Sequence, residues 1–340
     1  MDAAVVDTKL SPNWRDELRR YTQPRLNRSL FDLGTSVVPY LILLGSMFAA
    51  ARLSVVPVLV LAFPAAGFLL RSFIVFHDCA HGSFFRTRRA TTLLGRGIGL
   101  LVWLPFRCWQ HEHAVHHATA GNLDRRGIGD ITTLTVTEYE ALPTAGRIGY
   151  RLFRNPVVMF GFGWLLVLVL KPRFVPREAS RSVRNSVLAT NLAIALIVTT
   201  MCWLVGWRDY LLVQGTVFLI AGAVGVFLFY VQHQFEDTYW QSHGDWQYEE
   251  AALKGSSYLK LPPILQFFTG NIGFHHVHHL SVGIPNYNLQ HAHESSERLR
   301  TVPELTLRDA LRVTRLKLWD ERTGRLVTFR DAGVFRQGRH

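Results

Sequence analysis

Four long runs of apolar residues divide the chain. They lie at about 33–51, 55–76, 187–207 and 210–231, and their innermost stretches carry no Asp, Glu, Lys or Arg. Because a helix needs about 20 mostly apolar residues to cross a bilayer, each run is long enough to span a membrane. The links 52–54 and 206–209 are short, which favours two antiparallel helical hairpins. The sequence therefore predicts an all-α integral membrane protein with four transmembrane helices.

Two further apolar segments are shorter. Residues 91–106 and 156–170 fall below the length of a typical span, and Pro105 and Pro156 bound them. We expect interfacial or re-entrant helices there.

The charge distribution predicts the orientation in the membrane. The net charge is +12, and residues 77–186 contain 15 Lys and Arg against 7 Asp and Glu. Basic segments stay in the cytoplasm, so this middle segment is expected there. Because the number of spans is even, both termini are expected on the same side. The sequence thus predicts a multi-pass protein of the cytoplasmic membrane. The predicted division is a cytoplasmic segment 1–32, a membrane domain 33–294 with a cytoplasmic helical cap, and a basic cytoplasmic tail 295–340.

Eight histidines form three groups with helical spacing. Residues three and four positions apart are neighbours on one helix face, so each group is a cluster of imidazoles. The groups are HDCAH with His77 and His81, HAVHH with His113, His116 and His117, and HHVHH with His275, His278 and His279.

The three groups are expected on one side of the membrane and therefore in one site. Neutral imidazole suits iron, copper, zinc and nickel, and eight imidazoles exceed what one tetrahedral zinc needs. Their number predicts two metal ions. His233 follows the last apolar run, at the same depth in the membrane as the HDCAH motif that follows the second run. We therefore expect it to be a ninth ligand.

Other polar residues near these groups are candidates for supporting roles. Metal-bound histidines usually donate their second N–H to a carboxylate or carbonyl. Asp78, Asp124 and Asp130 could accept such bonds. Asn271 could bond a ligand or a metal-bound water, or it could serve as a loop residue or helix cap. His111 and His276 fall off the ligand faces and are expected around the site or at the surface. The surface is the default for the remaining four histidines, His243, His291, His293 and His340.

At these motifs the chain resembles the membrane fatty acid desaturase family. The resemblance covers about residues 73–294, and it is most specific at 109–130, 232–240 and 255–287, which are similar to bacterial acyl-lipid desaturases. It implies that the eight histidines of the three groups, together with His233, bind two ferrous ions in a non-haem di-iron centre. The three-residue gap in HDCAH points away from the acyl-CoA branch of the family.

The resemblance also implies a reaction and its partners. An acyl lipid from the bilayer would be desaturated with O2 to a cis alkene. Electrons would come from a separate soluble carrier such as a ferredoxin or flavodoxin, because the sequence contains no dinucleotide-binding motif of its own. An acidic carrier would suit the basic face.

Two other functions compete with this interpretation. A membrane hydroxylase or ketolase could use the same histidines on an alkyl or carotenoid substrate. A metal transporter would place ionisable residues inside its spans, and the spans here are expected to carry none. A nucleic-acid partner is excluded by the four spans.

Overall fold

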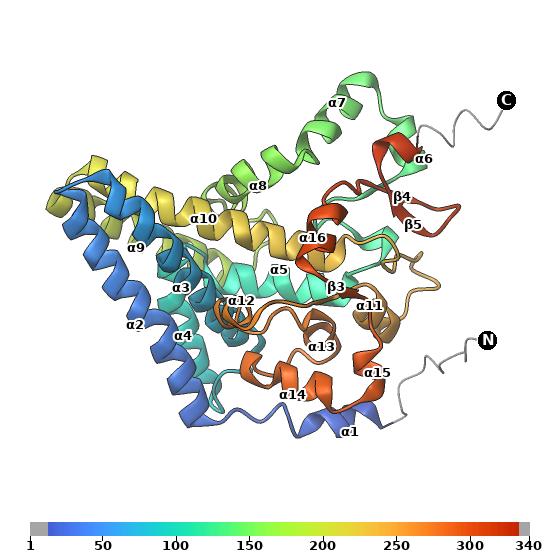
Figure 1. Cartoon of the computed structure of the whole chain (residues 1–340), viewed down its shortest axis with the longest axis horizontal. Helices are drawn as coiled ribbons and strands as arrows, with labels where there is room; N and C mark the ends of the chain where they lie inside the picture. The colour runs from blue at the N-terminus through green and yellow to red at the C-terminus, as the bar shows by residue number, and fades with distance from the viewer. Residues whose placement is uncertain (1–12, 333–340) are drawn as a thin grey trace.

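The structure is a computed structural model that describes residues 13–332. It is mostly helical, and four long helices form its apolar half (Figure 1). They are α2 (Leu26–Ala51), α3 (Val55–His81), α9 (Arg181–Val205) and α10 (Trp207–His233). Three of these helices contain a predicted apolar run in full, and α9 contains all of the run 187–207 except its last two residues. The predicted helical membrane protein is thus confirmed in its general form.

The two predicted hairpins are present. Ser54 begins α3 because its hydroxyl accepts a hydrogen bond from the backbone N–H of Val56 at 3.3 Å, which caps the new helix. Gly206 separates α9 from α10 with a φ of 87°, a conformation that glycine adopts without strain. Both links turn the chain back at the end of the bundle that lies far from the histidine groups.

A fifth segment is also long and apolar enough to cross a membrane. It covers Pro156–Arg173 and consists of α8 (Pro156–Trp164), the π-helical turn η2 (Leu165–Leu170) and the 3₁₀ turn η3 (Lys171–Arg173). Just before α8, the Arg154 guanidinium donates to Gln234 Oε1 at 2.8 Å, beyond the end of α10. At the other end, Lys171 forms an ion pair with Glu112 in α5 at 3.0 Å. Both ends of this segment therefore contact the part of the protein that carries the histidines.

Shorter helices build a cap over one end of the bundle. Around the second histidine group the structure has α4 (Arg88–Leu101), α5 (Phe106–Thr119), η1 (Leu123–Arg125), α6 (Val136–Ala141) and α7 (Thr144–Phe153). The C-terminal third adds α11 (Tyr248–Lys254), α12 (Pro263–Phe268), α13 (His275–Leu280), η4 (Asn286–Asn288), α14 (Leu289–Glu294), α15 (Glu297–Arg300) and α16 (Leu307–Val313). The first described helix, α1 (Trp14–Arg19), packs on this cap through Trp14 and Leu18.

Within residues 13–332, five short strands join distant parts of the cap. β1 (Leu134–Thr135) pairs in parallel with β4 (Leu318–Asp320), which pairs antiparallel with β5 (Arg325–Val327). β2 (Tyr258–Leu259) pairs in parallel with β3 (Glu304–Leu305). Residues 297–332 are therefore folded onto the cap, so the described part of the predicted basic tail is not an extended appendage.

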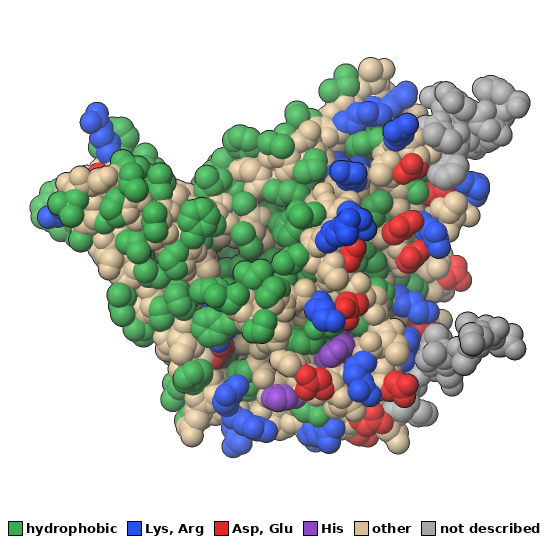
Figure 2. Space-filling view, in the orientation of Figure 1, with side chains coloured by type: hydrophobic (Ala, Val, Ile, Leu, Met, Phe, Trp, Pro, Cys, Tyr) green, Lys and Arg blue, Asp and Glu red, His purple; other side chains and the backbone are tan. Residues whose placement is uncertain are grey.

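The surface shows the same division into two parts. In Figure 2, hydrophobic side chains cover the face over α2 and α10, whereas Lys, Arg, Asp and Glu gather over the cap around α14, α15 and α16. Large exposed side chains such as Phe63, Leu192 and Leu196 lie on the long helices and suit contact with lipid. The protein is thus built to be embedded in a membrane on one side and solvated on the other.

The long helices contain a buried ion pair that the hydropathy pattern did not predict. Arg71 in α3 donates to the carboxylate of Asp32 in α2, and the two residues are 7% and 3% exposed. Arg71 lies inside the second apolar run, where the neighbouring apolar residues mask a single charge. The expectation that these helices carry no ionisable residue is therefore wrong.

Candidate metal centre

Four helices bring nine histidines together at the junction of bundle and cap. α3 ends with His77 and His81, α10 ends with His233, and α5 and α13 lie between them with the two HxxHH motifs. The side chains separate into two groups, and within each group the candidate ligand atoms all lie within 4.8 Å of one another. The first group contains His77, His81, His113, His117 and His278, and the second contains His116, His233, His275 and His279.

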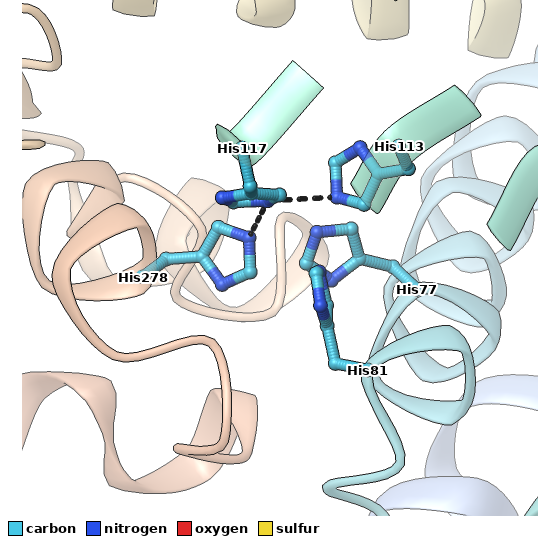
Figure 3. Close-up of side chains that lie close together, drawn as sticks. All are labelled: His77, His81, His113, His117 and His278. Atoms are coloured by element: carbon cyan, nitrogen blue, oxygen red, sulfur yellow. Dashed lines mark hydrogen bonds between the residues drawn. The ribbon is translucent and has the colours of Figure 1, made fainter. Parts of the chain in front are cut away.

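The first group draws on all three motifs. Figure 3 shows its five imidazoles pointing into one space from α3, α5 and α13. His117 Nε2 lies 3.0 Å from His113 Nε2 and 3.0 Å from His278 Nε2. One ring nitrogen either donates its proton or accepts with its lone pair, so His117 Nε2 cannot satisfy both neighbours by hydrogen bonding. A shared cation would satisfy all three nitrogens.

The second group lies beside the first. His233 Nε2 and His275 Nε2 are 2.9 Å apart. The ring of His116 lies 4.8 Å from that of His233 and 5.0 Å from that of His279, measured between centroids. The rings of His117 and His279, one from each group, are 4.1 Å apart. Two adjacent sites of five and four imidazoles result.

Buried nitrogen atoms without partners show that the residues fit metal ions. The Nε2 atoms of His81, His116 and His279 are buried and have no hydrogen-bond partner within residues 13–332. A buried polar atom left without a partner costs free energy and calls for an explanation such as an ion. The separations of 2.9–3.0 Å also match two ligands about 90° apart on an ion with bonds of about 2.1 Å.

The protonation states suit the same role. Burial lowers the pKa values of His113, His117, His275, His278 and His279 well below the usual range of histidine, and nearby imidazoles lower them further. These rings are therefore neutral near pH 7, and each keeps a lone pair that a metal ion can use.

Two of the predicted supporting carboxylates contact the histidines. Asp130 Oδ1 lies within hydrogen-bond distance of His116 Nδ1, which leaves His116 Nε2 for the second group. Asp78 Oδ1 lies 3.5 Å from Nδ1 of His77 in the first group. Asp78 Oδ2 instead accepts hydrogen bonds from the backbone and side chain of Asn286.

The other two predicted supporting residues lie outside the histidine groups. Asp124 Oδ2 accepts a 2.6 Å hydrogen bond from the backbone N–H of His243, so Asp124 joins two surface loops. Asn271 donates from Nδ2 to the backbone oxygen of Asn286 and accepts from Gln266. Neither residue makes a hydrogen bond to any of the nine histidines.

The remaining histidines divide into a buried pair and surface residues. His276 Nε2 lies 3.1 Å from His293 Nδ1, and both residues are buried, so the surface default is wrong for His293. His111 and His291 are exposed, as expected. His340 lies outside the described residues.

Three contacts of the site were not predicted from the sequence. The backbone oxygen of Gly255 lies 3.1 Å from His233 Nδ1, and the Trp109 ring stacks on His113 at 4.3 Å between centroids. Asn286 holds Asp78 behind His77. Trp109 lies four residues before His113, so the sequence could have predicted that the two side chains share a helix face. The other two contacts join segments far apart in sequence.

Comparisons with known proteins agree with this geometry. The sequence profile of the fatty acid desaturase family matches residues 52–306. The chain is 46% identical over 314 residues to a fatty acid desaturase of Bacillus subtilis (strain 168), covering 92% of this chain and 89% of that protein. It is 30% identical to the sn-1 oleoyl-lipid 12-desaturase of Synechocystis sp., covering 67% of this chain and 64% of that protein. It is 29% identical to the sn-1 acyl-lipid omega-3 desaturase (ferredoxin) of Nostoc sp., covering 66% of this chain and 62% of that protein.

The match includes all nine clustered histidines, because each lies between residues 52 and 306. The resemblance inferred from the three motifs is therefore confirmed, and the chain belongs to the fatty acid desaturase family.

Proposed function

We propose that this protein introduces a cis double bond into the acyl chain of a membrane lipid, at a di-iron centre held by the nine clustered histidines. Desaturation of acyl chains follows from the family, and acyl lipids are named as substrates of two relatives. The observation that carries the site is the division of the histidines into groups of five and four, with ligand atoms within 4.8 Å of one another.

The ligand chemistry supports iron as the metal. Imidazole is a common ligand of iron in proteins, and the site lacks the thiolates that structural zinc often uses. Cys79 and Cys108 are buried nearby but join neither group. Two bound ferrous ions would supply, with O2, the oxidising power to remove hydrogen from two adjacent methylenes.

The chain itself contributes orientation and exclusion of water. Asp130 fixes the ring of His116, and the Gly255 carbonyl fixes that of His233, so both Nε2 atoms are directed to the second group. The Trp109 ring packs against His77 of the first group, and Phe76 packs on Trp109. This apolar packing keeps bulk water from a site at which a reactive oxidant must meet only the substrate.

The reaction needs an electron donor outside this chain. One O2, two protons, two electrons and two substrate hydrogens balance to one double bond and two waters. We propose a separate acidic carrier, a ferredoxin or a flavodoxin, and the name of the Nostoc relative includes ferredoxin. The net charge of +12 favours such a partner through electrostatic steering.

We also propose four membrane spans, with the cap and both termini in the cytoplasm and residues 33–294 forming the membrane domain. The apolar segment 156–173 then enters the bilayer and returns. Its two ends support this, because Arg154 and Lys171 both contact segments on the histidine side. The excess of Lys and Arg in residues 77–186 supports a cytoplasmic cap.

A lipid profile tests the proposed reaction. The gene would be expressed in a host without polyunsaturated lipids, and the fatty acid methyl esters would be analysed by mass spectrometry. We expect a new cis double bond that requires O2 and is absent with His278→Ala. A hydroxylated or keto product in its place would assign the chain to the competing hydroxylase or ketolase class, and an unchanged profile in the presence of a ferredoxin system would contradict the proposal.

A further inference from the structure

A cleft opens where the start of α2 meets the cap helices α12 and α14. Its volume is about 440 Å³, within the range of about 300–1,000 Å³ that is typical of small-molecule sites. Phe31 and Phe267 form part of its wall and are 62% and 39% exposed. The cleft is therefore apolar at its edge and is large enough for part of a lipid.

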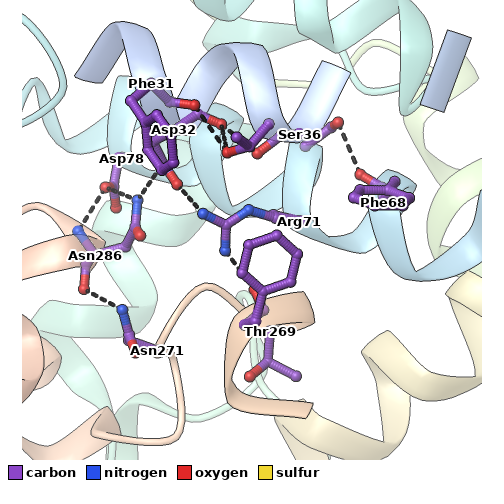
Figure 4. A network of polar contacts seen from close by, with 12 residues as sticks. Phe31, Asp32, Ser36, Phe68, Arg71, Asp78, Thr269, Asn271 and Asn286 are labelled. Carbon is purple, nitrogen blue, oxygen red and sulfur yellow. Dashed lines mark hydrogen bonds and ion pairs between the residues drawn. The ribbon is translucent and has the colours of Figure 1, made fainter. Parts of the chain in front are cut away.

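The floor of the cleft is polar and buried. Arg71 donates to the Asp32 carboxylate and to the backbone oxygen of Phe267, and Figure 4 shows the side chains of Arg71 and Asp32 directed toward one another. Arg71 is only 7% exposed, and its Nε has no hydrogen-bond partner within residues 13–332. An ion pair at this depth is costly in a membrane protein, and such residues commonly mark functional sites.

The backbone at the cleft is also unusual. Asn271, which lines the cleft, has a φ of 58°, the left-handed conformation that asparagine adopts more readily than most other residues with a side chain. Hydrogen bonds from Gln266 to Asn271 and from Asn271 to Asn286 hold the amide there. Both hydrogen-bond partners, Gln266 and Asn286, also line the cleft.

The charge of the cleft favours an anion. Arg28 lies at its rim, is exposed, and places its guanidinium 5.8 Å from the centroid of the Tyr287 ring. It has no ion-pair partner in the described part of the chain. Arg28, Arg71 and Asp32 are the charged residues of the lining and sum to +1.

The position of Arg28 along α2 corresponds to the level of lipid headgroups. The 26 residues of α2 extend about 39 Å, whereas the hydrocarbon core of a bilayer is about 30 Å thick. About six residues must therefore lie outside the hydrocarbon, and Arg28 is the third residue of the helix on the cap side. Phe31 is in the next turn and can contact acyl chains.

The cleft is connected to the metal centre. Asn286 lines it and donates to Asp78 Oδ2 at 2.9 Å, and Asp78 lies beside His77. Asn286 also donates to Asp32 at 2.8 Å (Figure 4). A molecule held in the cleft is thus separated from the first histidine group by two side chains.

We propose that this cleft binds the phosphodiester headgroup of an anionic phospholipid and so positions its acyl chain for the histidine centre. Arg28 contacts the phosphate, the amides of Gln266 and Gln290 face the polar glycerol region, and Phe31 and Phe267 flank the start of the chain. This inference rests on the proposed desaturation of an acyl lipid and specifies the substrate as an anionic phospholipid.

Binding of radiolabelled dioleoyl phosphatidylglycerol to the full chain in detergent micelles tests the proposal. Arg28→Gln should weaken binding about fivefold, because a basic residue near a lipid phosphate contributes that order of affinity. Arg28→Lys should restore most of it. Arg52→Gln is the matched control, since Arg52 is exposed at the opposite end of the same helix. Gln290→Trp, which fills the cleft, should weaken binding at least as much as Arg28→Gln.

Competition distinguishes the lipid from free phosphate. Inorganic phosphate and glycerol 3-phosphate should fail to displace the lipid at millimolar concentration, and dioleoyl phosphatidylcholine should compete less well than phosphatidylglycerol. Equal displacement by inorganic phosphate would overturn the headgroup assignment, and so would wild-type binding by both Arg28→Gln and Gln290→Trp. The assay needs no turnover, so a missing double bond in the lipid profile would count against the proposed function and not against the cleft.

Discussion

His116 and His117 are adjacent in α5 but belong to different histidine groups. His116 lies against His233 and His279, and its Nδ1 contacts Asp130. His117 lies against His113 and His278. Successive residues on a helix point about 100° apart, so α5 supplies His113 and His117 to the first group and His116 to the second.

Removing either histidine should affect one metal ion more than the other. In His116→Ala and in His117→Ala, we expect the metal content to fall from two ions per chain to about one. Each variant removes a ligand from one group and leaves the other group complete. Both variants should lose more than about 99% of desaturase activity, since the reaction needs the whole centre. Metal content by mass spectrometry of the purified protein measures the first effect and fatty acid analysis the second.

His111→Ala is the control for these variants. His111 lies on the same helix, is exposed and belongs to neither group. It should retain both ions and most of the activity. Loss of both ions from His116→Ala with no loss from His117→Ala would contradict the assignment of these neighbours to separate sites.

Asp130 and Asp124 provide a matched pair of carboxylates. Asp130→Asn should lower metal affinity or activity about 10–100-fold, because it removes the charge that orients His116. Asp124→Asn should stay within about twofold of the wild type, since Asp124 bonds only loop groups. Metal titration of the apoprotein measures the metal affinity of each variant, and the desaturation assay measures its activity. Equal losses in the two variants would mean that Asp130 supports the fold and does not orient the metal ligand.

The spacing of the histidines was sufficient to predict their clustering, because three- and four-residue intervals place side chains on one helix face. It was not sufficient to assign each histidine to a group. That assignment depends on the rotation of α5 between α3 and α13, which is a matter of tertiary packing. His233 could be suggested only from its position at the end of an apolar run.

The buried polar groups were the least predictable part of the structure. Arg71 lies within the apolar run 55–76, which masks its charge in a hydropathy average. Its partner Asp32 lies 39 residues earlier, just before the predicted start of the first span. His293 appeared isolated in sequence but pairs with His276, which lies 17 residues earlier in α13. Such partners are set by long-range contacts that no local pattern reports.

The docking of α8 on α10 can be tested at two glycines. A Cβ at Gly222 would lie 2.5 Å from Trp164 Cβ in α8, whereas a Cβ at Gly215 of the same helix meets nothing within 4 Å. Gly222→Ala should therefore destabilise the protein by about 1–3 kcal/mol through overpacking. Gly215→Ala should leave the stability unchanged or raise it slightly, because alanine favours helix. Thermal unfolding in detergent compares the two variants, and equal midpoints would contradict the close α8–α10 contact.

Reporter fusions can decide between four spans and five. Fusions at Arg52 and Arg208 should report the periplasmic side, and fusions after Arg89, Arg184 and Arg339 the cytoplasmic side. The Arg184 fusion is decisive because it follows the apolar segment 156–173. A periplasmic signal there would mean that this segment crosses the membrane.

The metal content of the purified protein tests the central claim most directly. Full-length protein would be isolated without chelators from iron-supplemented cells, and its iron and zinc would be quantified per chain by inductively coupled plasma mass spectrometry. Two groups of five and four imidazoles predict close to two irons per chain and little zinc. One zinc per chain without iron would contradict a di-iron desaturase centre.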